Sequence, residues 1–214
     1  ATASLFSCLF DSRSLTSIAM TFHRRPPCIL GVGTNYQDHI DEFKGQRPEH
    51  PVVFYKNPAS VIANGMAIEI PPIARTGELG VDYEGELAVI LSRDARDVEA
   101  GDALSFISHV AVANDVSQRW WQRISGGGQW CRAKSFDTFC PLSDPVDIES
   151  VVDLQDLMLE TYLNGELVQQ ANTGSMIFSV VDLISQLSAG TTLVAGTVIL
   201  TGTPGGVGMG RIPQ

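Results

Sequence analysis

The sequence predicts an α+β fold that is rich in β-structure. Val, Ile and Leu cluster in short runs that Gly and Pro interrupt, a pattern typical of strands and turns. The expected strands are Cys28–Val32, Val52–Tyr55, Ala67–Ile70, Tyr83–Leu91, Ser108–Ala113, Leu157–Leu163 and Val198–Thr201. Asn164-Gly165 follows one of these runs directly and predicts a two-residue hairpin turn.

Helices are expected to be fewer, at Tyr36–Phe43, Ser117–Arg123 and Ser175–Leu187. In the third segment apolar residues recur at helical spacing, which predicts a buried face. The 214 residues contain no internal repeat and no low-complexity linker, so residues 1–214 are expected to form a single domain. The serine-rich start loosely resembles a transit peptide, but SLFSCLF favours a first strand.

Composition narrows the class of protein. Hydrophobic residues make up 44% and charged residues 18%, which is typical of a globular chain. No apolar run approaches the ~20 residues of a membrane helix, so a soluble protein is expected. The formal net charge of −10 argues against a nucleic-acid partner, and a pocket for an anion would need its own cations. The scattered cysteines are expected to be reduced thiols of a cytoplasmic protein: Cys8, Cys28, Cys131 and Cys140.

Two glycine-rich segments fall short of nucleotide-binding loops. After Gly31 and Gly33, a dinucleotide fingerprint needs a third glycine where this chain has Tyr36. The segment from Thr201 to Gly208 can hold an anion with backbone N–H groups, but it lacks the Gly-Lys-Ser/Thr ending of a P-loop. A nucleotide-dependent oxidoreductase is therefore disfavoured.

Acidic residues gather in the segment VDYEGELAVIL. The strand period of two places Asp82, Glu84 and Glu86 on one face, which turns apolar beyond them. This segment is either a solvated acidic edge strand or a set of carboxylates whose repulsion a bound cation removes. Asp115 ends the apolar run His109–Ala113, where it can be a site residue or a helix cap. Carboxylate ligands select Mg²⁺, Mn²⁺ or Ca²⁺ over zinc.

A histidine and a glutamate form a second candidate group. His39 and Glu42 lie three residues apart, so on a helix they share a face. A carboxylate beside an imidazole orients it and raises its basicity, as a general base near neutral pH requires. The alternative is an ordinary surface pair; the position directly after Gly33-Thr34-Asn35 favours the site.

Seven motifs occur in an order that closely resembles the fumarylacetoacetate hydrolase family. They are GVGTNYQDHIDE, VVFYKNPAS, VDYEGELAVI, VANDVSQRWWQ, AKSFDTFCPL, LNGELVQ and ILTGTPGGVG, and they extend over about four-fifths of the chain. The resemblance implies a mixed β-roll and usually a homodimer, and the composition already argues against a nucleic-acid or membrane partner. The chain departs from the family pattern at Leu142-Ser143-Asp144, where a glycine-proline step is usual.

The resemblance also implies roles for particular residues. Glu84, Glu86 and Asp115 are expected to hold Mg²⁺ or Mn²⁺, whereas Asp82 is not a direct ligand in the family pattern. His39 and Glu42 resemble a catalytic dyad on a mobile lid. The other expected site residues are Lys134, which counters developing negative charge, and the substrate contacts Arg119, Gln122 and Thr203. Relatives continue beyond the residue that matches Gln214, so the C-terminal strands of the roll are expected to be missing here.

The implied reaction is cleavage of a C–C bond in acylpyruvate-type or fumarylacetoacetate-type diketo acids through an enolate that the metal stabilises. Oxaloacetate decarboxylation and isomerisation of 2-hydroxyhepta-2,4-diene-1,7-dioate use the same enolate and stay open as alternatives. A non-catalytic, metal-stabilised β-scaffold is the alternative outside enzymes; it would not require His39, Glu42 and Lys134 to converge. The expected compartment is the cytoplasm, or the mitochondrion in a eukaryote.

Overall fold

The central feature of the fold is one mixed, curled β-sheet. The computed structural model describes residues 25–75 and 80–211. Its 8-stranded sheet has the order β2-β1-β12-β5-β6-β8-β3, and β9 pairs with β6. The strands are β1 (Ile29–Gly33), β2 (Val52–Lys56), β3 (Val61–Ala63), β5 (Gly85–Leu91), β6 (Ile107–Asn114), β8 (Cys140–Leu142), β9 (Val146–Asp147) and β12 (Val198–Leu200). The pairs β1–β12 and β3–β8 are parallel and the others antiparallel, which gives the predicted β-rich α+β fold.

Strand β5 is buried on both faces. Leu87, Val89 and Leu91 belong to a core cluster that includes residues of the longest helix, whereas Ala88 and Ile90 belong to a second cluster on the opposite face. This alternation is the one that the strand period predicts. The segment is therefore a central strand and not a solvated acidic edge.

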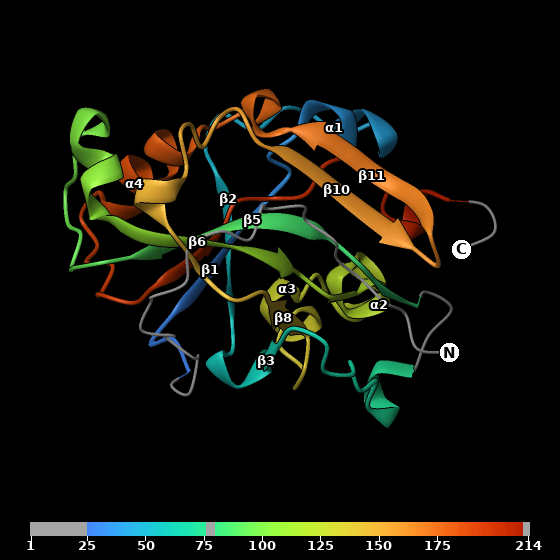
Figure 1. Ribbon diagram of the computed structural model, residues 1–214. Helices are drawn as coiled ribbons and strands as arrows, with labels where there is room; N and C mark the ends of the chain where they lie inside the picture. Colours follow the sequence, from blue (N-terminus) through green and yellow to red (C-terminus); the bar gives the residue numbers. More distant parts are fainter. Residues whose placement is uncertain (1–24, 76–79, 212–214) are drawn as a thin grey trace.

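A hairpin of β10 (Met158–Leu163) and β11 (Glu166–Asn172) lies above the main sheet in Figure 1. Its turn is Asn164-Gly165, with φ values of 54° and 84°. Two successive positive φ angles are the requirement of a tight hairpin turn, and Asn-Gly meets it with little strain. Leu163 pairs with Glu166 directly across the turn, so the predicted hairpin is confirmed.

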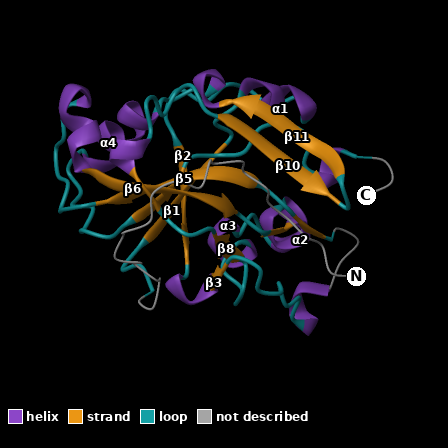
Figure 2. Cartoon of the chain, viewed as in Figure 1, coloured by secondary structure: helices purple, strands orange, loops and turns teal. Residues whose placement is uncertain are grey.

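Within the described residues the α-helices are short: α1 (Gln37–Glu42), α2 (Arg119–Gln122), α3 (Trp130–Ala133) and α4 (Val180–Ser188). Figures 1 and 2 show where they lie around the sheet. Helix α4 begins later than predicted, because Ser179 and Asp182 form a reciprocal capping box at its start. Short 3-10 turns lie at Pro58–Ser60, Pro72–Arg75, Ala100–Phe106, Ile124–Gly126, Ile148–Ser150, Thr173–Ser175 and Gly208–Gly210. No helix in the described ranges is long and apolar enough to cross a membrane.

Some local predictions are wrong. Ala67–Ile70 is not a strand; Glu69 is instead held by the hydroxyl of Thr138, and two prolines follow the segment. The predicted strand Tyr83–Leu91 begins two residues late, as β5 (Gly85–Leu91), and the preceding β4 (Val81–Asp82) pairs separately with β7 (Ser117–Gln118). The latter strand occupies the start of the predicted helix Ser117–Arg123. The expected first strand SLFSCLF lies outside the described residues.

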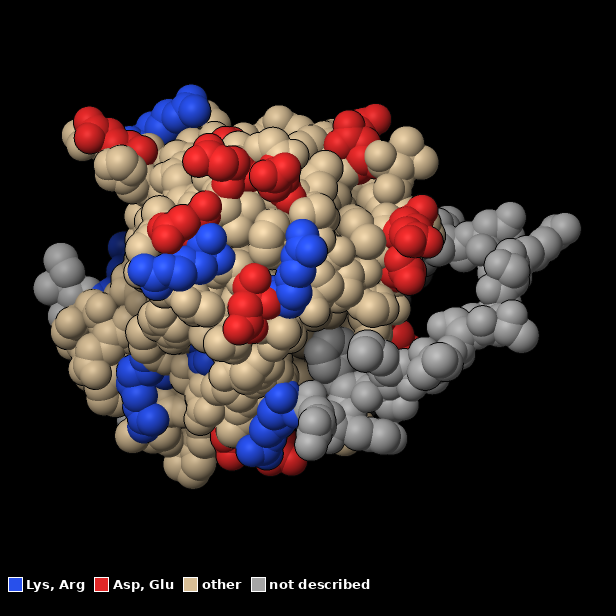
Figure 3. All heavy atoms as spheres, turned by 90° about the vertical axis from the view of Figure 1, so that its left-hand side faces the viewer, with Lys and Arg blue, Asp and Glu red and all other residues tan. Residues whose placement is uncertain are grey.

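Charged side chains do not gather in one patch on the face that Figure 3 shows. On the face in Figure 3, acidic and basic side chains are scattered over a largely uncharged surface. Cys28, Cys131 and Cys140 are free thiols, as predicted, and Cys8 lies outside the described residues. The charged residues that form the candidate site are buried instead.

Candidate active site

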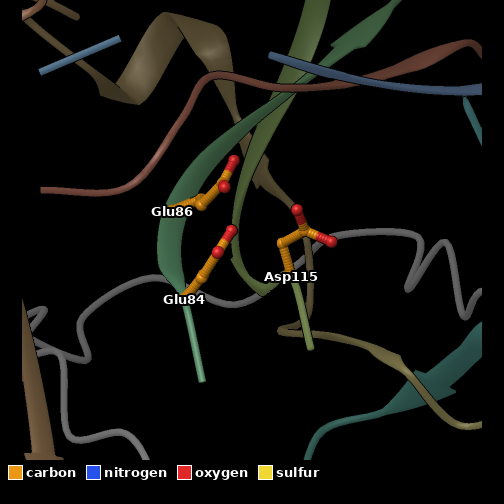
Figure 4. Close-up of side chains that lie close together, drawn as sticks. All are labelled: Glu84, Glu86 and Asp115. Carbon is orange, nitrogen blue, oxygen red and sulfur yellow. The ribbon is translucent and has the colours of Figure 1, made fainter. Parts of the chain in front are cut away.

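Three carboxylates meet because β5 and β6 are antiparallel neighbours. Gly85 pairs with Asn114, so Glu84, just before β5, lies beside Asp115, just after β6. The backbone N–H of Asp115 donates to the carbonyl of Glu84 at 2.8 Å. Glu86 points into the same space, and one carboxylate oxygen from each of the three residues lies within 4.8 Å of the others (Figure 4). The structure therefore brings together the predicted metal-binding triad.

Buried cations surround two of these carboxylates. The Nζ of Lys134 lies 2.7 Å from Glu84 and 2.5 Å from Asp115, and also donates to the hydroxyl of Ser117. The Nζ of Lys56 lies 2.6 Å from the other oxygen of Asp115. Arg119 donates to the second oxygen of Glu84 at 2.6 Å. All these side chains are almost fully buried, so their charges interact strongly.

Glu86 lacks such a partner. In the described structure its one hydrogen bond is accepted from the backbone N–H of Gly202, at 2.8 Å. Burial, followed by repulsion from Asp115 and Glu84, raises the pKa of Glu86 well above its usual value. Burial also acts to raise the pKa of Glu84, but there Lys134 and Arg119 outweigh it and hold the pKa below its usual value. The cluster therefore has unbalanced negative charge at Glu86.

This donor set fits a hard divalent cation. Three buried carboxylates with oxygens close together match the ligands that Mg²⁺ and Mn²⁺ prefer. A cation would also offset the uncompensated charge on Glu86. It would compete with the ammonium of Lys134 for Glu84 and Asp115, because Lys134 bonds to both.

Glu86→Gln should stabilise the metal-free protein at neutral pH. The pKa of Glu86 is near 4.5 in the unfolded chain and higher in the folded protein. The wild type therefore loses stability as the pH rises from the unfolded-state pKa through the folded-state pKa. Glutamine does not titrate, so the variant escapes this loss. Urea unfolding with a chelator present should give similar free energies below about pH 4.5 and a growing advantage of the variant above it. A difference that is independent of pH would contradict the unbalanced charge at Glu86.

Asp82 lies outside the triad although strand parity placed it on the same face. Its carboxylate accepts from the Nε of Arg119 at 2.8 Å and from the N–H groups of Gly208 and Met209. A Cβ at Gly208 would come within 2.6 Å of this carboxylate, which explains the glycine. Asp82 therefore anchors the glycine-rich segment to Arg119.

The backbone N–H groups of the glycine-rich segment do bind anions, but these anions are carboxylates of the protein itself. Its N–H groups donate to Glu86 from Gly202, to Glu42 from Gly206 and to Asp82 from Gly208. The predicted capacity of these backbone groups is thus used to fix acidic side chains of the site.

His39 is buried and faces Glu42. Its Nδ1 lies 3.4 Å from the Oε2 of Glu42, longer than a strong hydrogen bond, and its ring meets the edge of Phe43. Burial lowers the pKa of His39 below its usual value, although Glu84 and Glu42 oppose this effect. The imidazole is therefore neutral at neutral pH and can accept a proton. The alternative of an exposed surface pair is excluded, because His39 is only 9% exposed.

One open cavity unites the two groups. It is lined by Val32, Gly33, Thr34, His39, Glu84, Gln122, Trp130, Lys134 and Thr203. Of the predicted substrate contacts, Gln122 and Thr203 line it. Arg119 does not; its guanidinium is engaged by Asp82, Glu84 and the Oε1 of Gln122. Because arginine only donates, this contact leaves the amide nitrogen of Gln122 as the group available to a ligand.

Sequence reasoning missed several residues of the site. Lys56 binds Asp115 and the backbone carbonyl of Lys134 from the end of β2. Its signal was available, since strand parity places Lys56 on the buried face with Phe54. Trp130 and Ser117 have no such signal, because only the tertiary fold brings them to the cavity and to Lys134.

Comparison with known proteins identifies the family. Residues 28–214 match the model of the fumarylacetoacetate (FAA) hydrolase C-terminal family. The chain is 39% identical over 190 residues to a rat protein named oxaloacetate tautomerase Fahd2a, mitochondrial, covering 88% of this chain and 59% of that one. It thus spans well under two-thirds of the length of this curated relative.

Solved structures have the same fold. A 5-carboxymethyl-2-hydroxymuconate delta-isomerase from Mycobacterium smegmatis is 40% identical with a TM-score of 0.75, covering 86% of this chain and 70% of that one. A fumarylacetoacetate hydrolase from Exiguobacterium antarcticum is 39% identical with a TM-score of 0.78, covering 88% and 67% respectively. The expected β-roll is thereby confirmed, and the chain belongs to the fumarylacetoacetate hydrolase C-terminal family.

Proposed function

We propose that the chain carries the active site of a divalent-metal-dependent enzyme that hydrolyses a C–C bond in acylpyruvate-type diketo acids. The observation that carries this proposal is a single cavity lined by Glu84, His39 and Lys134. A cation site, a neutral imidazole and an ammonium group are the three components that such a reaction needs. A non-catalytic metal scaffold gives no reason for these side chains to converge.

We assign the metal to Glu84, Glu86 and Asp115, with Mg²⁺ or Mn²⁺ as the ion. When bound, the ion would supply a Lewis acid that stabilises the enolate of a 2-keto acid. Lys56 and Arg119 fix the carboxylates from the side of the protein, by their bonds to Asp115 and Glu84. Their role is to hold the donor oxygens in place before the ion arrives.

The remaining chemistry belongs to His39, Glu42 and Lys134. Glu42 orients the imidazole through Nδ1, which leaves Nε2 to take a proton from water as the water attacks the C4 carbonyl. The C3–C4 bond then breaks, and its electron pair stays on C3 as the enolate. The imidazolium of His39 returns that proton to C3, which gives pyruvate, and the acyl group leaves as a carboxylic acid that loses its own proton to solvent. Lys134 remains an ammonium, since Asp115 and Glu84 outweigh burial and raise its pKa, and it counters negative charge in the cavity.

A second candidate is proton transfer on a 2-keto acid, without an added water. It is favoured by the rat relative named as an oxaloacetate tautomerase and the mycobacterial structure named as a delta-isomerase. The neutral imidazole of His39 could move a proton between carbon and oxygen in the same cavity. Decarboxylation of oxaloacetate would use the same enolate.

A product assay separates these reactions. Metal-loaded protein should be incubated with acylpyruvates, with oxaloacetate and with unsaturated keto-diacids, and the products identified by NMR. Pyruvate and a carboxylate from an acylpyruvate support hydrolysis. Turnover restricted to keto–enol exchange, CO₂ release or double-bond migration would replace hydrolysis by the corresponding alternative.

Binding of a 2-keto acid analogue should order the lid. We expect residues 36–46, which carry His39 and Glu42, to exchange amide hydrogens more slowly when Mn²⁺ and oxalate are both present. Oxalate resembles the enolate of pyruvate and should hold this segment over the cavity. Hydrogen exchange read by mass spectrometry tests this, with Mn²⁺ alone as the control. Equal protection in both samples would indicate a fixed helix.

A further inference from the structure

Thr34 has an unfavourable backbone conformation at the wall of the cavity. Its φ is 54°, in the left-handed region, which is uncommon for a β-branched residue. Such a conformation is strained, and strained backbone of this kind clusters at functional sites. Glycine adopts this region without strain, and asparagine does so more readily than threonine. The presence of threonine therefore calls for a compensating role of its side chain.

The neighbours of Thr34 fix the turn independently of its side chain. On one side the ring of Trp130 packs so closely on Gly33 that a Cβ there would come within 2.5 Å of it. On the other side the amide of Asn35 donates to the carbonyls of Phe178 and Thr201. These contacts would impose the same backbone path on any residue at position 34. The turn itself does not need threonine.

A second threonine offers a direct comparison. Thr138 also has a positive φ, of 69°, but its hydroxyl accepts from the N–H of Glu69 at 2.8 Å and donates to the carbonyl of the same residue. It thereby holds a distant segment of the chain. Among the described residues, the hydroxyl of Thr34 bonds only to the carbonyl of its neighbour Gly33. The use of the Thr34 side chain lies in the cavity that it lines.

We propose that Thr34 is a specificity-determining substrate contact that limits the length of the group at the far end of the 2-keto acid. Glu84 and Lys134 belong to the carboxylate cluster and mark the end where the keto-acid head is expected. Four other lining residues, Val32, Gly33, Thr34 and Trp130, carry no charge. These uncharged residues fit a short uncharged tail. The inference rests on the proposed function, because it takes a 2-keto acid as the ligand.

The test compares ligands that share a head and differ in the tail. Calorimetry of the Mn²⁺-loaded protein gives affinities for oxalate, pyruvate and 2-oxohexanoate. In Thr34→Gly the oxalate affinity should stay within about twofold, since oxalate has no tail. The affinity for 2-oxohexanoate relative to pyruvate should rise about tenfold, the lower limit of what a removed steric contact changes. Thr34→Asn, which keeps a side chain of similar size, should keep the wild-type ratio.

Thr138→Gly is the matched control, and it should change the thermal midpoint without changing this ratio. Thr34→Gly should keep a thermal midpoint near that of the wild type, because relief of strain offsets the added freedom of the unfolded chain. If Thr34→Gly still bound oxalate but had the wild-type ratio of affinities for 2-oxohexanoate and pyruvate, the inference would be wrong and the proposed function would stand. Failure of the wild-type protein to bind oxalate or pyruvate would overturn the proposed function, and this inference with it.

Discussion

Replacing Glu84, Glu86 or Asp115 by alanine should abolish turnover and weaken Mn²⁺ binding. The loss of affinity should exceed the roughly 10–100-fold that follows when a residue hydrogen-bonded to a metal ligand is removed. Each residue supplies one of the three buried carboxylates, and neither Lys56 nor Lys134 can replace a lost ligand oxygen. Calorimetric titration of metal-stripped protein measures the effect. Glu99→Ala, at an exposed carboxylate, is the control and should bind Mn²⁺ as the wild type does.

The three variants should differ in stability. Glu84→Ala and Asp115→Ala each remove one of the two carboxylates that pair with the buried ammonium of Lys134. Both variants should therefore have a lower free energy of unfolding than the wild type. Glu86→Ala removes a carboxylate that has no cationic partner, so it should not lower stability in this way. In this variant a change in Mn²⁺ affinity can therefore be measured without a loss of stability. Unchanged Mn²⁺ affinity in all three would end the assignment of the metal site.

Glu42→Gln should lower hydrolysis of an acylpyruvate by roughly the 10²–10⁴-fold typical of general-base loss. A glutamine amide can no longer stabilise the imidazolium that forms when His39 takes a proton from water. Metal binding should be unchanged, because Glu42 is not one of the three carboxylates of the triad. Steady-state kinetics with Asp41→Asn as control, a carboxylate on the same helix that bonds only to Gln37 in the described structure, isolates the effect.

The same substitution should affect oxaloacetate decarboxylation less, since loss of CO₂ requires no activated water. In Glu42→Gln the rate of hydrolysis should therefore fall more than the rate of decarboxylation, although both reactions use the same cavity. Wild-type hydrolysis by Glu42→Gln would show that the dyad mechanism is wrong, and would favour the decarboxylase or isomerase reading.

Strand parity predicted that Glu84 and Glu86 share a face, but it included Asp82 as well, and only the family resemblance joined Asp115 to them. Glu84 and Glu86 share a face because the strand period requires it, and Asp115 joins them because β5 and β6 pair with Gly85 opposite Asn114. The Asn164-Gly165 hairpin was equally predictable, because few other sequences adopt two positive φ angles.

Features that depend on long-range packing were not predictable in this way. The short strands β3 and β8 pair in parallel across some 80 residues of sequence, and neither is long enough to show a period. Thr34 and Trp130 meet at the cavity only because β1 and α3 pack together around Gly33. The backbone strain at Thr34 appears only in its φ angle, which no local sequence pattern indicates.

The most direct test of the central claim is whether a divalent ion and a 2-keto acid analogue meet in this cavity. Electron paramagnetic resonance of the Mn²⁺-loaded protein should be recorded with ordinary oxalate and with oxalate labelled with oxygen-17. We expect the labelled ligand to broaden the Mn²⁺ lines in the wild type. Glu86→Ala, which holds the ion poorly, should give no such protein-bound signal. Mn²⁺ bound tightly by the wild type with lines that the label leaves unchanged would show that the ion is structural, and would contradict the account.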